Sequence, residues 1–238
     1  MITLVQFPRY RGFPNMSPFC LKVETYLKMA QIPYQVQGTF DFKKAPKGKM
    51  PYIIDEGQYV ADSAFILEHL VKKYGNKVDA HLSPLAAAQH HAFIKMMEED
   101  MVPMGVYMRW VDEQGWSQFQ KIIFGKMPLP LRLIVPTMIH RKMKSRLLAQ
   151  GIGRHSREEI IHLAEKDVQA LSVYLGDKKY FSGDQPCTMD AACFGMIGNM
   201  VYETISNPLT DVVKKYPNLV AHSELMLKTY FPEFVKPA

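Results

Sequence analysis

The sequence predicts an α+β fold in which a small mixed domain is followed by an all-helical one. Within the first 75 residues, short apolar runs typical of strands alternate with helix-start signals, in the order β-α-β and then β-β-α. Beyond residue 83 the apolar residues recur at helical spacing. A chain of 238 residues suits two small domains. We therefore expect domains at 1–75 and 83–238, joined through residues 75–82.

The first domain is predicted to contain four short strands and two helices. Ser17-Pro18 and Asp62-Ser63 each mark a helix start, because Ser and Asp side chains cap free N–H groups and Pro fits the first helical position. Asp55-Glu56-Gly57 is the turn of a hairpin. The expected strands are Ile2–Phe7, Tyr34–Val36, Met50–Ile54 and Gln58–Ala61, and the helices are expected to end before Pro33 and near Tyr74.

Capping residues also mark the helices of the second domain. Ser83-Pro84 opens a long helix, and Ser156 with Glu159 forms a capping box for a helix that reaches about Leu175. Between them, residues 131–148 are predicted to be helical, with a kink or break at Pro136. Further helices are expected around 190–202 and from Pro208 and Pro217.

Composition limits the class of protein. The chain has no run of about 18 apolar residues, so we expect no membrane span, and it opens on a strand pattern instead of a secretory signal. Its three cysteines, Cys20, Cys187 and Cys193, lack the spacing of a disulfide framework or a zinc site, so no metal is expected. These features favour a reducing cytoplasm.

The net charge of +6 is unevenly distributed along the chain. Residues 1–78 carry eleven Lys and Arg against six Asp and Glu, which favours a small anionic ligand. Residues 121–157 carry nine Lys and Arg and no acid. Their mixture of leucine and basic residues fits either an anionic membrane surface or a helix with a solvated basic face. Binding of nucleic acid is not expected, because no recognition motif is present.

Four short motifs follow one another along the chain: Ser17-Pro18-Phe19-Cys20, Lys49-Met50-Pro51, Asp62-Ser63 and 182–190. On these motifs the sequence resembles the glutathione S-transferase superfamily over nearly its whole length. The stretches 45–51, 216–220 and 230–233 resemble its branch of metaxins and failed-axon-connections proteins, especially the bacterial members. The resemblance implies a thioredoxin-like first domain, an all-helical second domain, glutathione as co-substrate, a hydrophobic electrophile as the second substrate, and a homodimer.

The resemblance assigns Ser17 as the catalytic residue. A hydroxyl at this helix N-terminus donates a hydrogen bond to a bound thiolate and lowers the pKa of the thiol. Tyr10 is the alternative, because some classes of the family use a Tyr hydroxyl shortly after the first strand. Without the other motifs, Ser17 would be only a helix cap. Cys20 lies one helical turn beyond Ser17 and lacks a partner cysteine, so dithiol exchange is not expected.

The resemblance also assigns glutathione-binding residues. Pro51 matches a cis-proline, which leaves the backbone of Met50 to pair with the ligand as an added strand would. Asp62 and Ser63 match the pair that binds the γ-glutamyl end, and Lys49 matches a position that reaches the ligand's carboxylates. Without the other motifs, Pro51 would be only an edge-strand proline, Asp62-Ser63 a capping pair and Lys49 a solvated side chain.

The acceptor pocket is expected between the domains. Met101, Met104, Tyr107 and Met108 are candidates for its lining, although their helical spacing fits a helix core equally well. In the capping motif of the second domain, Cys187 stands where the family has Thr or Ser. That difference predicts a weaker cap, or a helix start shifted to Thr188.

Two functions follow from these residues. The first is an enzyme that activates the glutathione thiol for conjugation to a hydrophobic electrophile. The second is a non-catalytic adaptor that binds a partner or a membrane surface through residues 121–157, since a fold does not fix a function.

Overall fold

The computed structural model describes residues 1–9, 12–125, 127–202, 205 and 207–235. Its N-terminal part is a four-stranded sheet in the order β2-β1-β3-β4. β1 is parallel to β2 and antiparallel to β3, and β3 is antiparallel to β4. The elements are β1 (Ile2–Gln6), α1 (Pro18–Met29), β2 (Tyr34–Gly38), β3 (Tyr52–Asp55), β4 (Gln58–Ala61) and α2 (Ser63–Tyr74). The predicted order β-α-β then β-β-α is confirmed.

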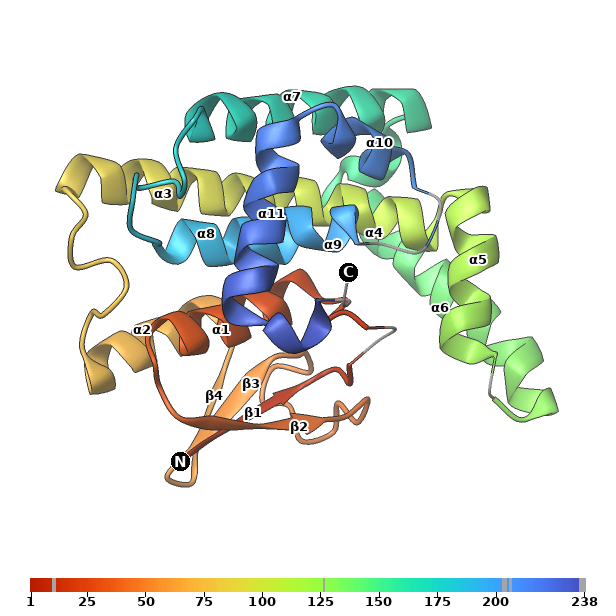
Figure 1. Ribbon diagram of the computed structural model, residues 1–238. Helices are drawn as coiled ribbons and strands as arrows, with labels where there is room; N and C mark the ends of the chain where they lie inside the picture. Colours follow the sequence, from red (N-terminus) through yellow and green to blue (C-terminus); the bar gives the residue numbers. More distant parts are fainter. Residues whose placement is uncertain (10–11, 126, 203–204, 206, 236–238) are drawn as a thin grey trace.

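The two helices of this part pack on the sheet through one apolar core. Both helices begin at the predicted caps: the N–H of Cys20 donates to Ser17 Oγ, and the N–H of Ala64 donates to the Asp62 carboxylate. In Figure 1, α1 and α2 lie between the sheet and the helical part of the chain. The buried core includes Ile2, Leu4 and Ile53 from the strands, Val23 and Leu27 from α1, and Ile66 and Leu70 from α2.

The rest of the described chain is helical. α3 (Pro84–Met96), a π-helical segment (Met97–Met101) and α4 (Val102–Trp110) follow one another without a gap and cross the molecule as one long rod (Figure 1). The capping box predicted at Ser156 is present. The other helices are α5 (Glu113–Phe124), α6 (Leu129–Gln150), α7 (Arg157–Leu175), α8 (Thr188–Cys193), a π-helical segment (Phe194–Gly198), α9 (Asn199–Val201), α10 (Pro208–Lys214) and α11 (Pro217–Tyr230), with 3-10 turns at Ile152–Arg154 and Pro232–Phe234.

Residues 113–150 form a pair of helices, here called the α5–α6 arm, that projects from the helical body (Figure 1). The sequence did not predict α5, whose aromatic residues pack locally on Trp110 instead of following a long apolar ladder. The helix predicted at 131–148 is present as α6, which continues through Pro136 without a break. Among the described helices, none combines the length and the hydropathy needed to cross a bilayer.

The first turn of α1 is docked closely on the helical part. A Cβ built on Gly195 would lie 2.5 Å from the carbonyl oxygen of Pro18, so only glycine allows this approach. One turn further along, Asn199 Nδ2 donates to the carbonyl of Asn15, at 3.2 Å. Lys22 of α1 forms a buried ion pair with Glu98 in the first π-helical segment. These contacts fix the start of α1 against the second half of the chain.

Asp190 organises the capping motif of α8 in a way that differs from the prediction. Cys187 is the N-cap and Thr188 is the first helical residue, so the cap has not moved to Thr188. The Asp190 carboxylate, fully buried, accepts from the N–H of Cys187 at 2.8 Å and from the N–H of Phe181 at 3.0 Å. It also contacts Nε2 of the buried His222 at 2.8 Å. The partners of Asp190 therefore take over the stabilisation that a Thr or Ser cap would give.

This network predicts a large loss of stability in Asp190→Ala. The substitution leaves buried N–H groups and a buried imidazole without their acceptor, which costs about 3–5 kcal/mol in comparable buried pairs. Urea unfolding followed by tryptophan fluorescence measures the change. Asp184→Ala is the matched control, because Asp184 is an exposed residue of the same motif and is expected to change stability by less than about 0.5 kcal/mol. Equal stabilities of the two variants would contradict this role.

Candidate functional site

Three segments that are far apart in the sequence meet at one end of the sheet. In the sheet register Val5 lies opposite Tyr52, and Tyr52 lies opposite Ala61. The chain leaving β1, the chain entering β3 and the chain leaving β4 are therefore neighbours. Cys20, in the first turn of α1, shares a buried cluster with Met50 and Ala61. The sequence-predicted residues Ser17, Met50–Pro51 and Asp62–Ser63 thus converge on one region.

Ser17 is half-buried at the N-terminus of α1. Its Oγ accepts from the N–H of Cys20 at 3.4 Å, and its own N–H donates to Asn15 Oδ1 at 3.0 Å. The first N–H groups of a helix and its dipole favour negative charge at this position. The hydroxyl therefore lies where an anion is stabilised. Tyr10, the alternative catalytic residue, lies outside the described residues.

Asn15 was not among the predicted site residues, yet it holds the loop that delivers Ser17. Its side chain is fully buried and Nδ2 donates to the carbonyl of Phe7 at 2.8 Å. Arg9 supports the same loop by donating to the carbonyl of Pro14 at 2.9 Å and by pairing with the buried Glu24 of α1. An Asn close before a helix start was the only sequence signal, and it does not reveal these long-range partners.

The second segment contains a cis peptide bond between Met50 and Pro51. Met50 packs inward beside Val5, Cys20 and Tyr52, whereas the Lys49 side chain is exposed. The backbone of Met50 therefore lies between the buried cluster and the surface next to the first turn of α1.

The third segment has an unusual backbone at Asp62. Asp62 has φ +82°, a region that residues with a side chain rarely adopt. Its exposed carboxylate accepts from the N–H of Ala64 at 3.0 Å, and Ser63 is buried beneath it. Backbone outliers of this kind cluster at ligand-binding sites, so the conformation points to a binding role for Asp62.

Cys20 is poorly suited to nucleophilic chemistry at this site. The side chain is fully buried, and burial raises the pKa of its thiol to about 12 despite the nearby Ser17 hydroxyl, which acts in the opposite direction. A thiol with such a pKa is protonated at neutral pH and is a poor nucleophile. All three cysteines are buried free thiols.

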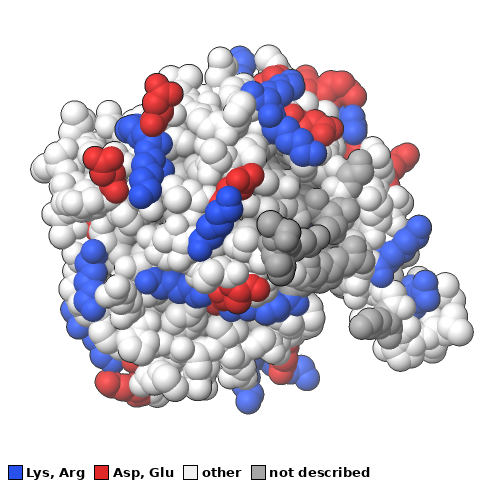
Figure 2. All heavy atoms as spheres, viewed as in Figure 1, with Lys and Arg blue, Asp and Glu red and all other residues white. Residues whose placement is uncertain are grey.

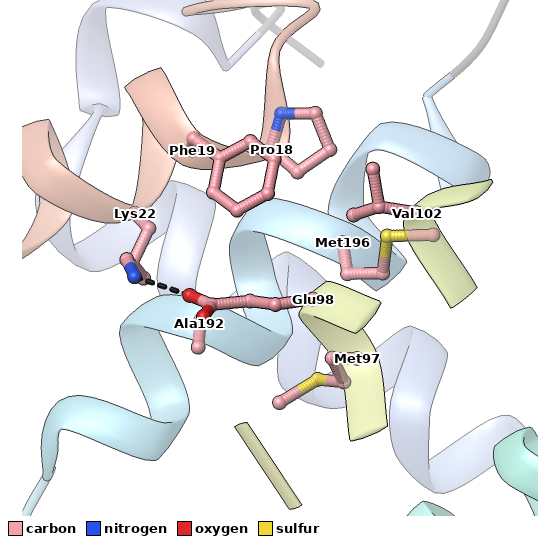
Figure 3. A pocket seen from close by; sticks show the side chains of 8 residues that line it. All are labelled: Pro18, Phe19, Lys22, Met97, Glu98, Val102, Ala192 and Met196. Atoms are coloured by element: carbon pink, nitrogen blue, oxygen red, sulfur yellow. Dashed lines mark hydrogen bonds and ion pairs between the residues drawn. The ribbon is translucent and has the colours of Figure 1, made fainter. Parts of the chain in front are cut away.

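A small apolar hollow lies beside the first turn of α1, between this helix and the helical part. Figure 3 shows Pro18 and Phe19 above Val102 and Met196, with the Lys22–Glu98 ion pair at one edge. Met97 and Ala192 complete the lining. The sequence did not identify this set, because its members come from three separate stretches of the chain, 18–22, 97–102 and 192–196, and no local pattern joins them.

The structure places the candidates for the acceptor pocket in the core of the helical part. Met101, Met104 and Met108 are at most 4% exposed and belong to the core of the helical part, together with residues such as Ile160 and Val168. Tyr107 is half-buried against the same core. These side chains follow the core alternative left open by their helical spacing. On the same rod, Val102 and Met97, which is itself a core residue, line the hollow. Within the described residues, no group of three His, Cys, Asp or Glu side chains is arranged to hold a metal ion.

Solved structures support the architecture. A glutathione S-transferase from Methylobacillus flagellatus, determined with glutathione bound, is similar over 100% of both chains, with a TM-score of 0.62 and 16% identity. The β-etherase LigF from Sphingobium is similar over 98% of both chains, with a TM-score of 0.66 and 16% identity. At this identity the likeness shows the fold.

Sequence comparisons identify the family. The glutathione S-transferase N-terminal domain matches residues 18–115, and the C-terminal domain of the same family matches residues 164–226. Isoprene-epoxide–glutathione S-transferase from Rhodococcus sp. (strain AD45) is 32% identical over 97% of this chain and 99% of its own length. Failed axon connections from Drosophila melanogaster is 33% identical over 98% of this chain and 59% of its own length, and human metaxin-2 is 26% identical over 90% and 82%. The chain therefore belongs to the glutathione S-transferase family.

Proposed function

We propose that the chain binds glutathione at this end of the sheet and activates the glutathione thiol at Ser17 for attack on a small hydrophobic electrophile. The convergence of the Ser17 cap, the Met50–Pro51 segment and the strained Asp62 carries the proposal. The excess of positive charge in residues 1–78 also suits an anionic tripeptide.

Ser17 acts on the thiol. Its hydroxyl donates to the thiolate sulfur while its oxygen accepts from the N–H of Cys20. The hydroxyl and the α1 dipole both favour the charged sulfur, and each pKa unit by which the thiol is lowered corresponds to about 1.4 kcal/mol. Tyr10 is the alternative donor for the same step.

The other residues hold the peptide. The backbone N–H and C=O of Met50 pair with the cysteinyl backbone in the manner of an added strand. The Asp62 carboxylate binds the γ-glutamyl amino group, and Ser63 with the N-terminus of α2 binds its carboxylate. Lys49, which is exposed, extends towards the remaining carboxylate.

We propose that the pocket for the electrophile begins at the hollow beside Phe19, because this hollow is apolar and adjoins the helix turn that begins at Ser17. The relative from Rhodococcus is named for an isoprene epoxide, so we propose a small apolar epoxide as the first electrophile to test. The thiolate sulfur forms a bond to the epoxide carbon and the C–O bond of the ring breaks. The electron pair goes to oxygen, which takes a proton from water.

An adaptor without catalysis is the second candidate. The names of the failed-axon-connections and metaxin relatives state no enzymatic activity.

For either function we propose that the protein is cytoplasmic and forms a homodimer. The three buried free thiols suit a reducing compartment.

Asp62→Ala is expected to weaken glutathione binding by at least about tenfold, because the amino group of the ligand loses its charged partner. Titration calorimetry on the full chain measures the dissociation constant. Glu68→Ala is the matched control, since Glu68 is an exposed carboxylate on the same helix. Equal affinities of wild type and Asp62→Ala would remove Asp62 from the site, and no heat with any variant would favour the adaptor.

Ser17→Ala is expected to raise the pKa of bound glutathione back towards its free value of about 8.5, whereas wild type holds it lower by about 1 to 2 units. Thiolate absorbance during a pH titration of the complex measures this pKa. Ser17→Thr keeps both the hydroxyl and the helix cap, so it should retain the lowered value. A lowered pKa that survives in Ser17→Ala and is lost in Tyr10→Phe would assign the step to Tyr10 instead.

Cys20 is expected to resist alkylation in the native protein at neutral pH, because burial holds the pKa of its thiol at about 12. Intact-protein mass spectrometry after iodoacetamide treatment should show the unmodified chain, and full alkylation only after denaturation. Rapid native labelling at Cys20, or loss of conjugation in Cys20→Ala with glutathione binding retained, would argue for thiol chemistry by the protein itself.

A further inference from the structure

The α5–α6 arm carries apolar side chains that the fold leaves exposed. In the first half of α6, five of them are between 50% and 73% exposed: Leu129, Leu131, Leu133, Ile134 and Met138. Monomeric soluble proteins rarely expose apolar groups so densely on one element without a partner.

These residues surround the helix instead of forming a single core-facing stripe. Pro136 and Leu147 are buried and lie three turns apart, so they mark the face of α6 that packs on the protein. Ile134 and Met138 lie two residues before and after Pro136, which places them about 200° round the helix, on the opposite face. No other described element covers them, as their exposure shows.

Basic residues follow directly behind this apolar end. Arg132 lies within it, and Arg141, Lys142, Lys144 and Arg146 occupy the next turns, all exposed. At about 1.5 Å per residue, Arg141 lies roughly 5 Å along the helix axis from Met138. Among the described residues, no carboxylate forms an ion pair with any of these five side chains, whereas Arg157, beyond the arm, pairs with Asp112 at 2.8 Å.

The picture of the surface agrees with this distribution. Figure 2 shows the projecting lobe at the lower right in white and blue, with no acidic side chain on the part of it that is visible. Residues 116–163, which hold most of α5 and all of α6, lie between the two domain matches.

We propose that the α5–α6 arm docks on an anionic lipid surface, with the apolar end of α6 in the headgroup region and the following cations on lipid phosphates. Cations beside an exposed apolar helix end match the chemistry of such a surface. A second copy of the chain fits less well, because two segments without acids would bring like charges together. A nucleic acid would pair with the cations and leave the apolar side chains without a partner.

Co-sedimentation of the full chain with vesicles tests this docking. Wild type is expected to sediment with vesicles that contain phosphatidylglycerol, to stay in solution with vesicles of phosphatidylcholine alone, and to be released by salt. Removing three cations in Arg141→Gln/Lys142→Gln/Lys144→Gln should lower the partition coefficient by about tenfold or more. The matched control Lys72→Gln/Lys166→Gln/Lys214→Gln removes three exposed cations elsewhere and should bind as wild type does.

A second pair of changes tests the apolar end. Leu131→Gln/Ile134→Gln alters two exposed side chains, so folding should be unaffected, and vesicle binding should fall at unchanged net charge. Equal binding of this variant and wild type would overturn the lipid assignment in favour of a general polyanion site. No sedimentation of wild type with anionic vesicles would also overturn it, and arm-dependent self-association in sedimentation velocity would assign the face to a second copy.

Discussion

The close contact between the first turn of α1 and the helical part of the chain determines where Ser17 lies relative to the second half of the molecule. Gly195 lets the Pro18 backbone approach, Asn199 holds the carbonyl of Asn15, and Lys22 pairs with Glu98 across the boundary. The helix that begins at Ser17 therefore cannot shift without disturbing buried groups whose separation is costly. The same contact encloses the apolar hollow. It therefore fixes the Ser17 hydroxyl and the proposed pocket for the electrophile relative to each other.

The parts of this arrangement that depend on local chemistry could be predicted from the sequence. Ser17-Pro18, Ser83-Pro84 and the Ser156–Glu159 box each begin the helix that they predict, because a cap acts within its own turn. What could not be predicted depends on partners far along the chain. Asn15 is an ordinary loop residue until its contacts with Phe7 and Asn199 are known.

The methionines of the long rod illustrate the same limit. Met97, Met101, Met104 and Met108 share one helical spacing and all belong to the core of the helical part, and Met97 also lines the hollow because α1 packs beside it. The start of α8 also depends on a distant partner. Asp190, held by His222, stabilises the N-cap at Cys187 without the Thr or Ser hydroxyl that is usual in the family. The proposed thiol site and the α5–α6 arm occupy different elements, so conjugation chemistry and surface docking are able to vary independently.

The most direct test of the central claim is a crystal structure of the chain grown with saturating glutathione. The account predicts the ligand at the end of the sheet where β1, β3 and β4 meet, with its sulfur within hydrogen-bond distance of Ser17 Oγ, its cysteinyl backbone paired with Met50 and its γ-glutamyl end on Asp62 and Ser63. Ligand density at another place on the chain, or a sulfur directed away from the start of α1, would contradict it.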